Sequence, residues 1–149
     1  MYRTILLATD GSDDSFEAAE RAADLAAQYG ATLSACYVIE TRTAYDNAIV
    51  DPEAVGRALR EEGEAALASV AELASEADVP IRGAIRRGVP HEELFDHVER
   101  EGVDLVVVGR QGRSSLRTVL LGSTTDALVR LCPVPVLVVG DPAAPVDGT

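Results

Sequence analysis

A glycine-rich segment, residues 109–124, contains the residues whose types and spacing best suit chemistry. It begins Gly109-Arg-Gln-Gly112 and, after nine further residues, continues Gly122-Ser123-Thr124. Glycine lets backbone N–H groups approach an anion closely, and a helix N-terminus adds donors and the positive end of a dipole. Ser123 and Thr124 supply hydroxyl donors. The segment is therefore expected to bind an anion such as a phosphate group.

Charge within the same segment favours an anionic ligand. Residues 109–122 contain Arg110, Arg113 and Arg117 and no acidic residue, although the whole chain has a formal net charge of −12. Each glycine alone is typical of a strand end or a turn, and Arg110 and Arg117 are equally compatible with a solvated surface. The glycine spacing, the local positive charge and the following helix together favour phosphate binding.

The composition of the whole chain narrows the classes of protein. Its 149 residues, 15.7 kDa, suit one domain. Thirteen basic residues, all arginine, oppose 25 acidic ones, which argues against nucleic acid or an anionic membrane as a partner. An acidic surface without lysine suits concentrated salt, which screens repulsion between like charges. We therefore expect a halophilic source, although a GC-rich genome would also favour arginine.

The N-terminus and the cysteines point to the cytoplasm. The apolar run at residues 5–8 is too short for a signal peptide, and no apolar run approaches the length of a membrane span. Cys36 and Cys132 lack the spacing of a zinc site or a disulfide framework, so we expect thiols in a reducing compartment.

Short β-type runs alternate with longer helical segments along the chain. Strands are predicted over residues 5–8, 32–39, 80–86, 104–108 and 134–139, and helices beginning near residues 14, 52, 90 and 123. Residues 40–51 form a long loop in this prediction, and 141–149 form a flexible tail. Asp14 with Glu17, and Ser123 with Asp126, have the spacing of capping boxes. Phe16 begins an alanine-rich stripe that is expected to face the sheet.

This alternation predicts one α/β domain over residues 1–140. The expected fold is flavodoxin-like or Rossmann-like: an open five-stranded parallel sheet, in the order 3-2-1-4-5, with helices on both faces. Pro135 cannot donate a hydrogen bond to a neighbouring strand, which predicts an edge position for the last strand. Ligands of such sheets bind at the carboxyl ends of the strands where strand order reverses. The loops after the first and fourth strands are therefore the expected site.

The same residues carry a resemblance to a known family. The glycine pattern, followed by a helix and by Cys132-Pro-Val-Pro-Val-Leu-Val-Val139, resembles the universal stress protein family, as does Ile5-Leu-Leu-Ala-Thr-Asp-Gly-Ser12. The resemblance covers nearly the whole chain. It implies the ATP-binding branch of the family, a role in stress response and a homodimer joined through the last strand.

The resemblance also implies which residues bind the nucleotide. Asp10 would contact adenosine or support a metal ion, although Asp-Gly-Ser at a strand end is also typical of a turn. Val38 would contact adenine, and Ala8 stands where some members carry proline or valine. The phosphates and ribose would lie against the glycine-rich segment. The full expected set is Ala8, Thr9, Asp10, Val38, Val108, Gly109, Gly112, Arg113, Ser114, Gly122, Ser123 and Thr124.

Several functions are compatible with such a domain. The favoured hypothesis is a regulator that binds ATP, with or without Mg²⁺, and has no catalytic residue or resident metal site. A slow ATP hydrolase and a dimeric interaction protein without nucleotide are the alternatives. Efficient phosphoryl transfer needs placed cations, and the chain has no lysine or Walker A sequence. A receiver domain also requires a lysine, and a flavin carrier requires more aromatic residues. His91 and His97 lack metal-site spacing.

Overall fold

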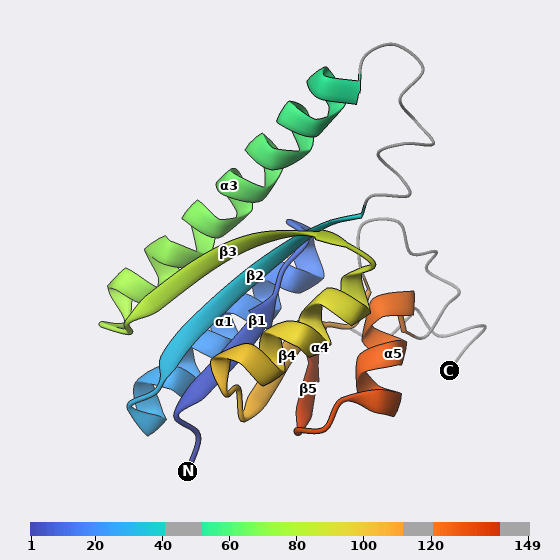
Figure 1. Ribbon diagram of the computed structural model, residues 1–149. Coiled ribbons are helices and arrows are strands. Elements are labelled where there is room, and N and C mark those ends of the chain that lie inside the picture. Colours follow the sequence, from blue (N-terminus) through green and yellow to red (C-terminus); the bar gives the residue numbers. More distant parts are fainter. Residues whose placement is uncertain (41–51, 112–120, 141–149) are drawn as a thin grey trace, which may run out of the picture.

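The structure, a computed structural model, describes residues 1–40, 52–111 and 121–140 (Figure 1). Its strands are β1 (Thr4–Ala8), β2 (Thr32–Glu40), β3 (Ile81–Gly88), β4 (Leu105–Gly109) and β5 (Val136–Val139). Its helices are α1 (Asp13–Tyr29), α3 (Pro52–Glu76), α4 (Pro90–Glu101) and α5 (Ser123–Leu131). Residues 41–51 of the predicted loop and all of the predicted tail lie outside the described residues.

The strands form one parallel sheet in the order β3-β2-β1-β4-β5, which confirms the predicted fold class and order. In β1, Leu7 is paired with Ala35 of β2 on one side and with Val107 of β4 on the other. The strand order therefore reverses at β1, because β2 and β3 lie on one side of it and β4 and β5 on the other. The carboxyl ends of β1, β2 and β4 meet at the same edge of the sheet.

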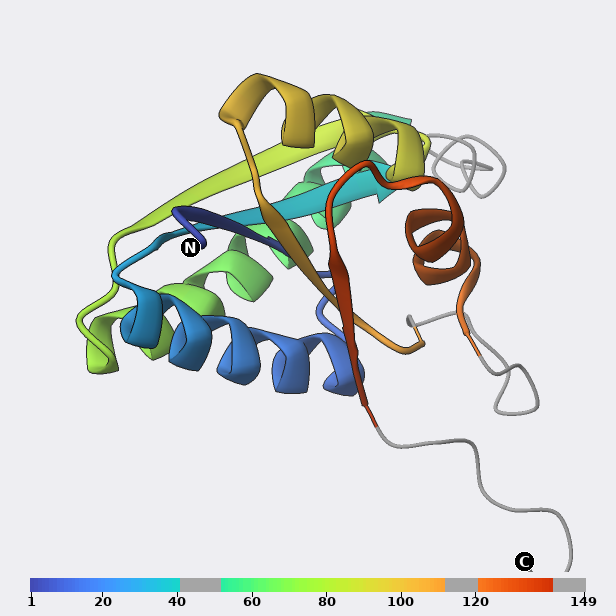
Figure 2. The same ribbon diagram turned by 90° about the horizontal axis from the view of Figure 1, so that it is seen from below.

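Helices cover both faces of the sheet (Figure 2). Two hydrophobic clusters fill the space between the sheet and these helices. Alternate residues of one strand point to opposite faces, so Leu7 packs with alanines of α1 and with Val70 of α3. Leu6, its neighbour, packs with Leu94 of α4 and Leu128 of α5. Because both faces of the central strands are covered, those strands appear in the sequence as continuous apolar runs.

The N-cap of helix α1 lies two residues earlier than the sequence predicted. Ser12 is the N-cap, and its Oγ accepts a hydrogen bond from the backbone N–H of Ser15 at 3.2 Å. The prediction of a capping box at Asp14 was wrong, because a serine two residues upstream already supplies the acceptor. Phe16, assigned to the buried stripe, is 47% exposed. The shifted start turns Ser15 and Ala18 toward the sheet in its place.

Helix α3 lies close against the end of β2 at a glycine. A Cβ atom at Gly63 would lie 2.8 Å from the Tyr37 ring, so only glycine allows this approach. Glycine in a helix interior costs about 1 kcal/mol relative to alanine, and here it brings the helix to the edge of the sheet. Among the described helices, none combines the length and the apolarity needed to cross a membrane.

Strand β5 lies at the edge of the sheet, next to β4, as Pro135 predicted. The strand begins at Val136, so Pro135 precedes it and uses its carbonyl, which accepts from the Val106 N–H at 2.9 Å. The missing N–H of proline therefore leaves no gap in the pairing between β4 and β5.

Candidate functional site

A cavity of about 320 Å³ opens at the carboxyl ends of β1, β2 and β4. Its walls also include parts of α3, α4 and the first turn of α5. A second hollow, of about 330 Å³, adjoins it between α1 and α3 and shares Thr9, Asp10 and Glu62 with it. The main cavity therefore occupies the place where ligands of open parallel sheets bind.

The turn between β1 and α1 forms the floor of this cavity through hydrogen bonds of its own. Asp10 Oδ1 accepts from the Ser12 N–H at 2.9 Å, and Thr9 Oγ1 accepts from the Gly11 N–H at 3.3 Å. Gly11 has a φ of 81°, in the left-handed region that favours glycine. Thr9 Oγ1 also donates to Ser15 Oγ at 3.2 Å. The carboxylate of Asp10 thus has the turn-forming role that Asp-Gly-Ser suggested, and it lines the cavity as well.

The end of β4 is fitted tightly against the start of α1. A Cβ atom at Gly109 would lie 2.8 Å from the backbone carbonyl carbon of Asp14 and 2.9 Å from the Ser15 nitrogen. These are backbone atoms, which cannot rotate away. The structure therefore gives Gly109 a packing reason that is independent of any phosphate.

Helix α5 presents its N-terminus to the cavity. Gly122 is the N-cap, with no side-chain hydrogen bond to the first turn, so the capping box predicted at Ser123 was wrong. Ser123 is instead the first helical residue, and its hydroxyl and that of Thr124 line the cavity. Thr125 Oγ1 donates to the Gly109 carbonyl at 2.6 Å and ties the helix to β4. The first N–H groups of a helix lack intrahelical partners, so this end can accept an anion.

Small and branched apolar side chains form the opposite wall. Ala8, Val38 and Val108 come from the three strand ends, and Leu94 comes from α4. Cys36 also lies in this wall, 1% exposed, and burial raises the pKa of its thiol to about 12. A thiol in that state is protonated at neutral pH and is a poor nucleophile. The wall suits a flat apolar group rather than covalent chemistry.

Acidic side chains are among those that line the cavity. Asp10, Glu40 and Glu62 line it, and no arginine does so among the described residues. Arg113 and Arg117 fall outside that part of the chain. Within it, no group of three His, Cys, Asp or Glu residues is placed to hold a metal ion.

The fold brings together nine of the twelve residues expected to bind the ligand. They come from β1 and its turn, from β2, from β4 and from the start of α5: Ala8, Thr9, Asp10, Val38, Val108, Gly109, Gly122, Ser123 and Thr124. Gly112, Arg113 and Ser114 lie outside the described residues. The set therefore converges on one cavity from segments more than a hundred residues apart.

Sequence reasoning missed the wall that α3 and α4 contribute. Leu59 and Glu62 of α3, and Pro90 and Leu94 of α4, line the cavity. Tyr37 of β2 lines the cavity too. In the sequence, Pro90 indicates the start of a helix and Leu94 belongs to the apolar face of that helix. Nothing in the sequence indicates how far along the sheet each helix lies.

Comparisons with known proteins agree with this architecture. The sequence profile of the universal stress protein family matches residues 1–140. The chain belongs to the universal stress protein family. Universal stress protein MJ0531 of Methanocaldococcus jannaschii is 36% identical over 143 residues, which cover 95% of this chain and 84% of that protein.

Two solved structures of this fold are also similar. The structure of hypothetical protein MJ0577 has a TM-score of 0.84 at 27% identity and covers 93% of this chain and 96% of its own. A universal stress protein solved in complex with cAMP has a TM-score of 0.69 at 28% identity, with coverage of 93% and 96%. At least one member of this family therefore binds an adenine nucleotide.

Proposed function

We propose that this chain binds ATP in the cavity and acts as a regulatory protein of the stress response. The observation that carries the proposal is the meeting, in one cavity, of an apolar wall and the N-terminus of α5. The first suits a purine ring and the second suits phosphates. The similar protein in complex with cAMP supports an adenine nucleotide as the ligand.

The dimensions and charges of the cavity fit this ligand. About 320 Å³ is within the usual range for small-molecule sites, roughly 300–1,000 Å³. In this proposal Val38, Leu94 and Val108 face the adenine, while Gly122, Ser123 and Thr124 face the phosphates. Mg²⁺ would accompany the triphosphate, because the carboxylates of Asp10, Glu40 and Glu62 would otherwise repel the phosphates. The remaining expected residues, Gly112, Arg113 and Ser114, belong to the same proposed set.

We further propose a homodimer joined through β5. This edge strand leaves Leu137 39% exposed, and Val129 and Leu131 of the neighbouring α5 are 49% and 66% exposed. Exposed apolar side chains beside an open strand edge suit association with a second copy. A cytoplasmic location completes the proposal, in line with the two free cysteines.

Mass spectrometry of small molecules released from the denatured protein is the direct test of ATP binding. The native chain is expected to release ATP or to take it up in salt-rich buffer. Gly122→Val places a branched side chain at the buried N-cap and should abolish binding. Ser123→Ala removes one hydroxyl donor and should weaken binding about three- to tenfold. The matched control is Ser75→Ala, which removes an exposed hydroxyl near the far end of α3.

The alternatives give different results in the same experiment. Release of ADP alone would favour slow hydrolysis and would require a turnover assay. An empty protein that fails to take up ATP would contradict the proposal. The domain would then act through its dimer surfaces alone.

A further inference from the structure

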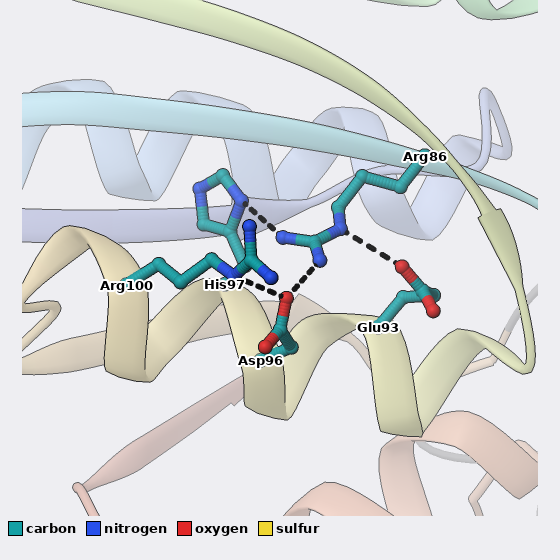
Figure 3. Close-up of polar contacts among 5 residues, drawn as sticks. All are labelled: Arg86, Glu93, Asp96, His97 and Arg100. Carbon is teal, nitrogen blue, oxygen red and sulfur yellow. Dashed lines mark hydrogen bonds and ion pairs between the residues drawn. The ribbon is translucent and has the colours of Figure 1, made fainter.

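A second polar cluster lies beside the cavity, between α4 and the sheet (Figure 3). We define this anchor cluster as Ser34 of β2, Arg86 of β3, and Glu93, Asp96 and His97 of α4. Arg86 Nε donates to Glu93 Oε1 at 3.0 Å, and its Nη2 donates to Asp96. A third guanidinium nitrogen, Nη1, lies 3.4 Å from Nδ1 of His97. Arg86 thereby joins β3 to three side chains of α4.

The geometry fixes the protonation state of His97. Arginine has only donors, so Nδ1 of His97 must accept from Arg86. The proton is then on Nε2, which donates to Ser34 Oγ at 2.7 Å. His97 is 4% exposed, so it has no water to replace these partners. A second proton on Nδ1 would point an N–H group at the guanidinium, and the two groups would repel.

The serine and histidine of this cluster are not a catalytic pair. Ser34 is 1% exposed and out of reach of a substrate. A catalytic histidine is oriented by a carboxylate at its second nitrogen, whereas His97 faces a guanidinium there. The pair therefore has a structural role.

Charged groups surround His97 from each element packed around it. Arg82 and Arg86 approach from β3, and Glu93, Asp96, Arg100 and Glu101 lie on α4 itself, while β2 contributes the neutral Ser34 and Cys36. On α5, Asp126 and Arg130 pair with each other at 3.2 Å. Burial lowers the pKa of His97 below 6.5; Glu101 opposes this effect, the charges of Arg86 and Arg82 add to it, and Asp96 opposes it.

The anchor cluster is joined directly to the cavity wall. The pair of Arg86 and Glu93 spans the turn between β3 and α4, which leads into Pro90 at the edge of the cavity. Gly88, the last residue of β3, has a φ of 146°, and a Cβ there would lie 2.8 Å from Glu93 Oε2. Leu94, in the cavity wall, is one residue after Glu93 and one turn before His97. Loss of the cluster would therefore loosen the part of α4 that forms the wall.

We propose that His97 positions the α4 wall of the nucleotide site and makes it sensitive to pH. Neutral His97 keeps Arg86 bound between β3 and α4, whereas protonated His97 displaces Arg86 and releases Pro90 and Leu94 from the cavity. Nucleotide affinity then falls in mild acid. This inference rests on the proposed function, since it assumes that the cavity binds a nucleotide.

Proton linkage gives the direction in which pH changes the stability of the α4 wall. The released state protonates His97 near the ordinary pKa of 6.5, while the anchored state does so only at lower pH. The stabilisation of the anchored wall is thus complete above pH 6.5 and is lost as the pH falls toward the lowered pKa. Each unit of difference between the two pKa values changes the equilibrium up to tenfold.

Two measurements on the full chain test the proposal. The first is the dissociation constant of ATP between pH 7.5 and 5.0 at constant salt. The second is the NMR titration of the histidine rings, together with the amide signals of residues 88–95. The chain has only two histidines, so the ring signal missing from His97→Gln identifies His97. The phosphates of ATP also titrate near pH 6, and comparing variants with the same ligand removes their contribution.

The variants are expected to separate clearly. ATP affinity of the natural chain should fall about tenfold across the range, and that of His97→Gln less than about twofold, because its amide donates to Ser34 but does not titrate. His91→Gln, the matched control, should behave like the natural chain. Arg86→Gln removes the charge that opposes protonation while Glu93 and Asp96 remain. Because Arg86 is also the contact that holds α4, the ATP affinity of this variant should already be reduced at pH 7.5, and the NMR titration of its His97 ring should move to higher pH. These two results decide the matter if His97→Gln does not fold.

Failure of this proposal differs from failure of the proposed function. If ATP binds at pH 7.5 and its pH profile is the same in His97→Gln and the natural chain, the positioning role is wrong. Protonation of His97 without any change in residues 88–95 would also overturn it. If ATP does not bind even at pH 7.5, the proposed function fails, and the link between His97 and residues 88–95 is then judged by NMR alone.

Discussion

Two helix N-termini lie at the same edge of the sheet, and they differ in what they offer a ligand. The start of α1 is satisfied by its own chain: Ser12 caps it, and Asp13 and Asp14 put negative charge in its first turn. The start of α5 has Gly122 as its cap and no side-chain hydrogen bond. The start of α5, with one acidic residue in its first turn, Asp126, therefore suits an anion better than the start of α1, which has two.

The difference shows how one edge can position two parts of a ligand. Asp14 of α1 accepts from the Gln111 N–H at 3.1 Å, so the acidic helix start holds the segment after β4 rather than a ligand. The glycine cap of α5 leaves backbone donors directed at the cavity. The first helix thus serves as scaffold, while the start of the second lines the cavity.

The largest change in stability is expected from adding a methyl group at Gly109, where the end of β4 touches the start of α1. In Gly109→Ala, the new Cβ would overlap the backbone of Asp14 and Ser15, which should destabilise the fold by about 2–3 kcal/mol. Urea unfolding measures this change. The matched control is Gly83→Ala in β3, where the nearest atom would be a Leu67 methyl at 3.5 Å. That substitution should be neutral or stabilising by up to about 1 kcal/mol; an equal loss in both variants would contradict the packing role of Gly109.

A side-chain cap on α5 would make it resemble α1. Gly122→Asp places a carboxylate where the phosphates are proposed to bind and should weaken ATP binding about 30-fold, or about 2 kcal/mol, without destabilising the fold. Isothermal titration calorimetry measures the affinity. Gly122→Asn supplies a cap of the same shape without the charge, and its ATP affinity should fall less than that of Gly122→Asp. Equal affinities in the two variants would show that charge at this terminus does not matter.

The smallest effect is expected from removing the cap of α1. Ser12→Ala should reduce stability by about 1 kcal/mol, because the Ser15 N–H loses its acceptor. ATP affinity should change less than twofold, since that hydroxyl is already engaged. Thermal unfolding and calorimetry on the same sample test both parts. Ser123→Ala should show the reverse pattern, with affinity reduced and stability retained. A large affinity loss in Ser12→Ala would mean that the two termini share the ligand.

The sequence was sufficient for the sheet and for the starts of α3, α4 and α5, but not for the capping residues of α1 and α5. Buried strands such as residues 105–108 are apolar throughout, and the switch to helical periodicity places the crossovers. The order of strands and the converging loops follow from those patterns. A helix start, by contrast, depends on which of several neighbouring polar residues caps it, as Ser12 did in place of Asp14. That choice is decided by packing, which shifted the buried face away from Phe16.

The site was only partly predictable for a related reason. The loops after β1 and β4 are brought together by the topology alone, and so Asp10 and Gly109 could be expected in one place. Val38 was expected only from the family resemblance. The α3 wall depends on the contact of Gly63 with Tyr37, which has no local signal. The anchor cluster is similar: Ser34 and His97 are 63 positions apart, and each alone looks like an ordinary polar residue.

The peptide groups of Arg110 connect the edge strand with the start of α5. Its N–H donates to the Val139 carbonyl at 2.7 Å, and its carbonyl accepts from the Gly122 N–H at 2.9 Å. Both bonds use atoms that nearly every amino acid has. During evolution, position 110 can therefore change its side chain while the connection is inherited unchanged, and proline, which lacks the N–H, is the one residue that would break it.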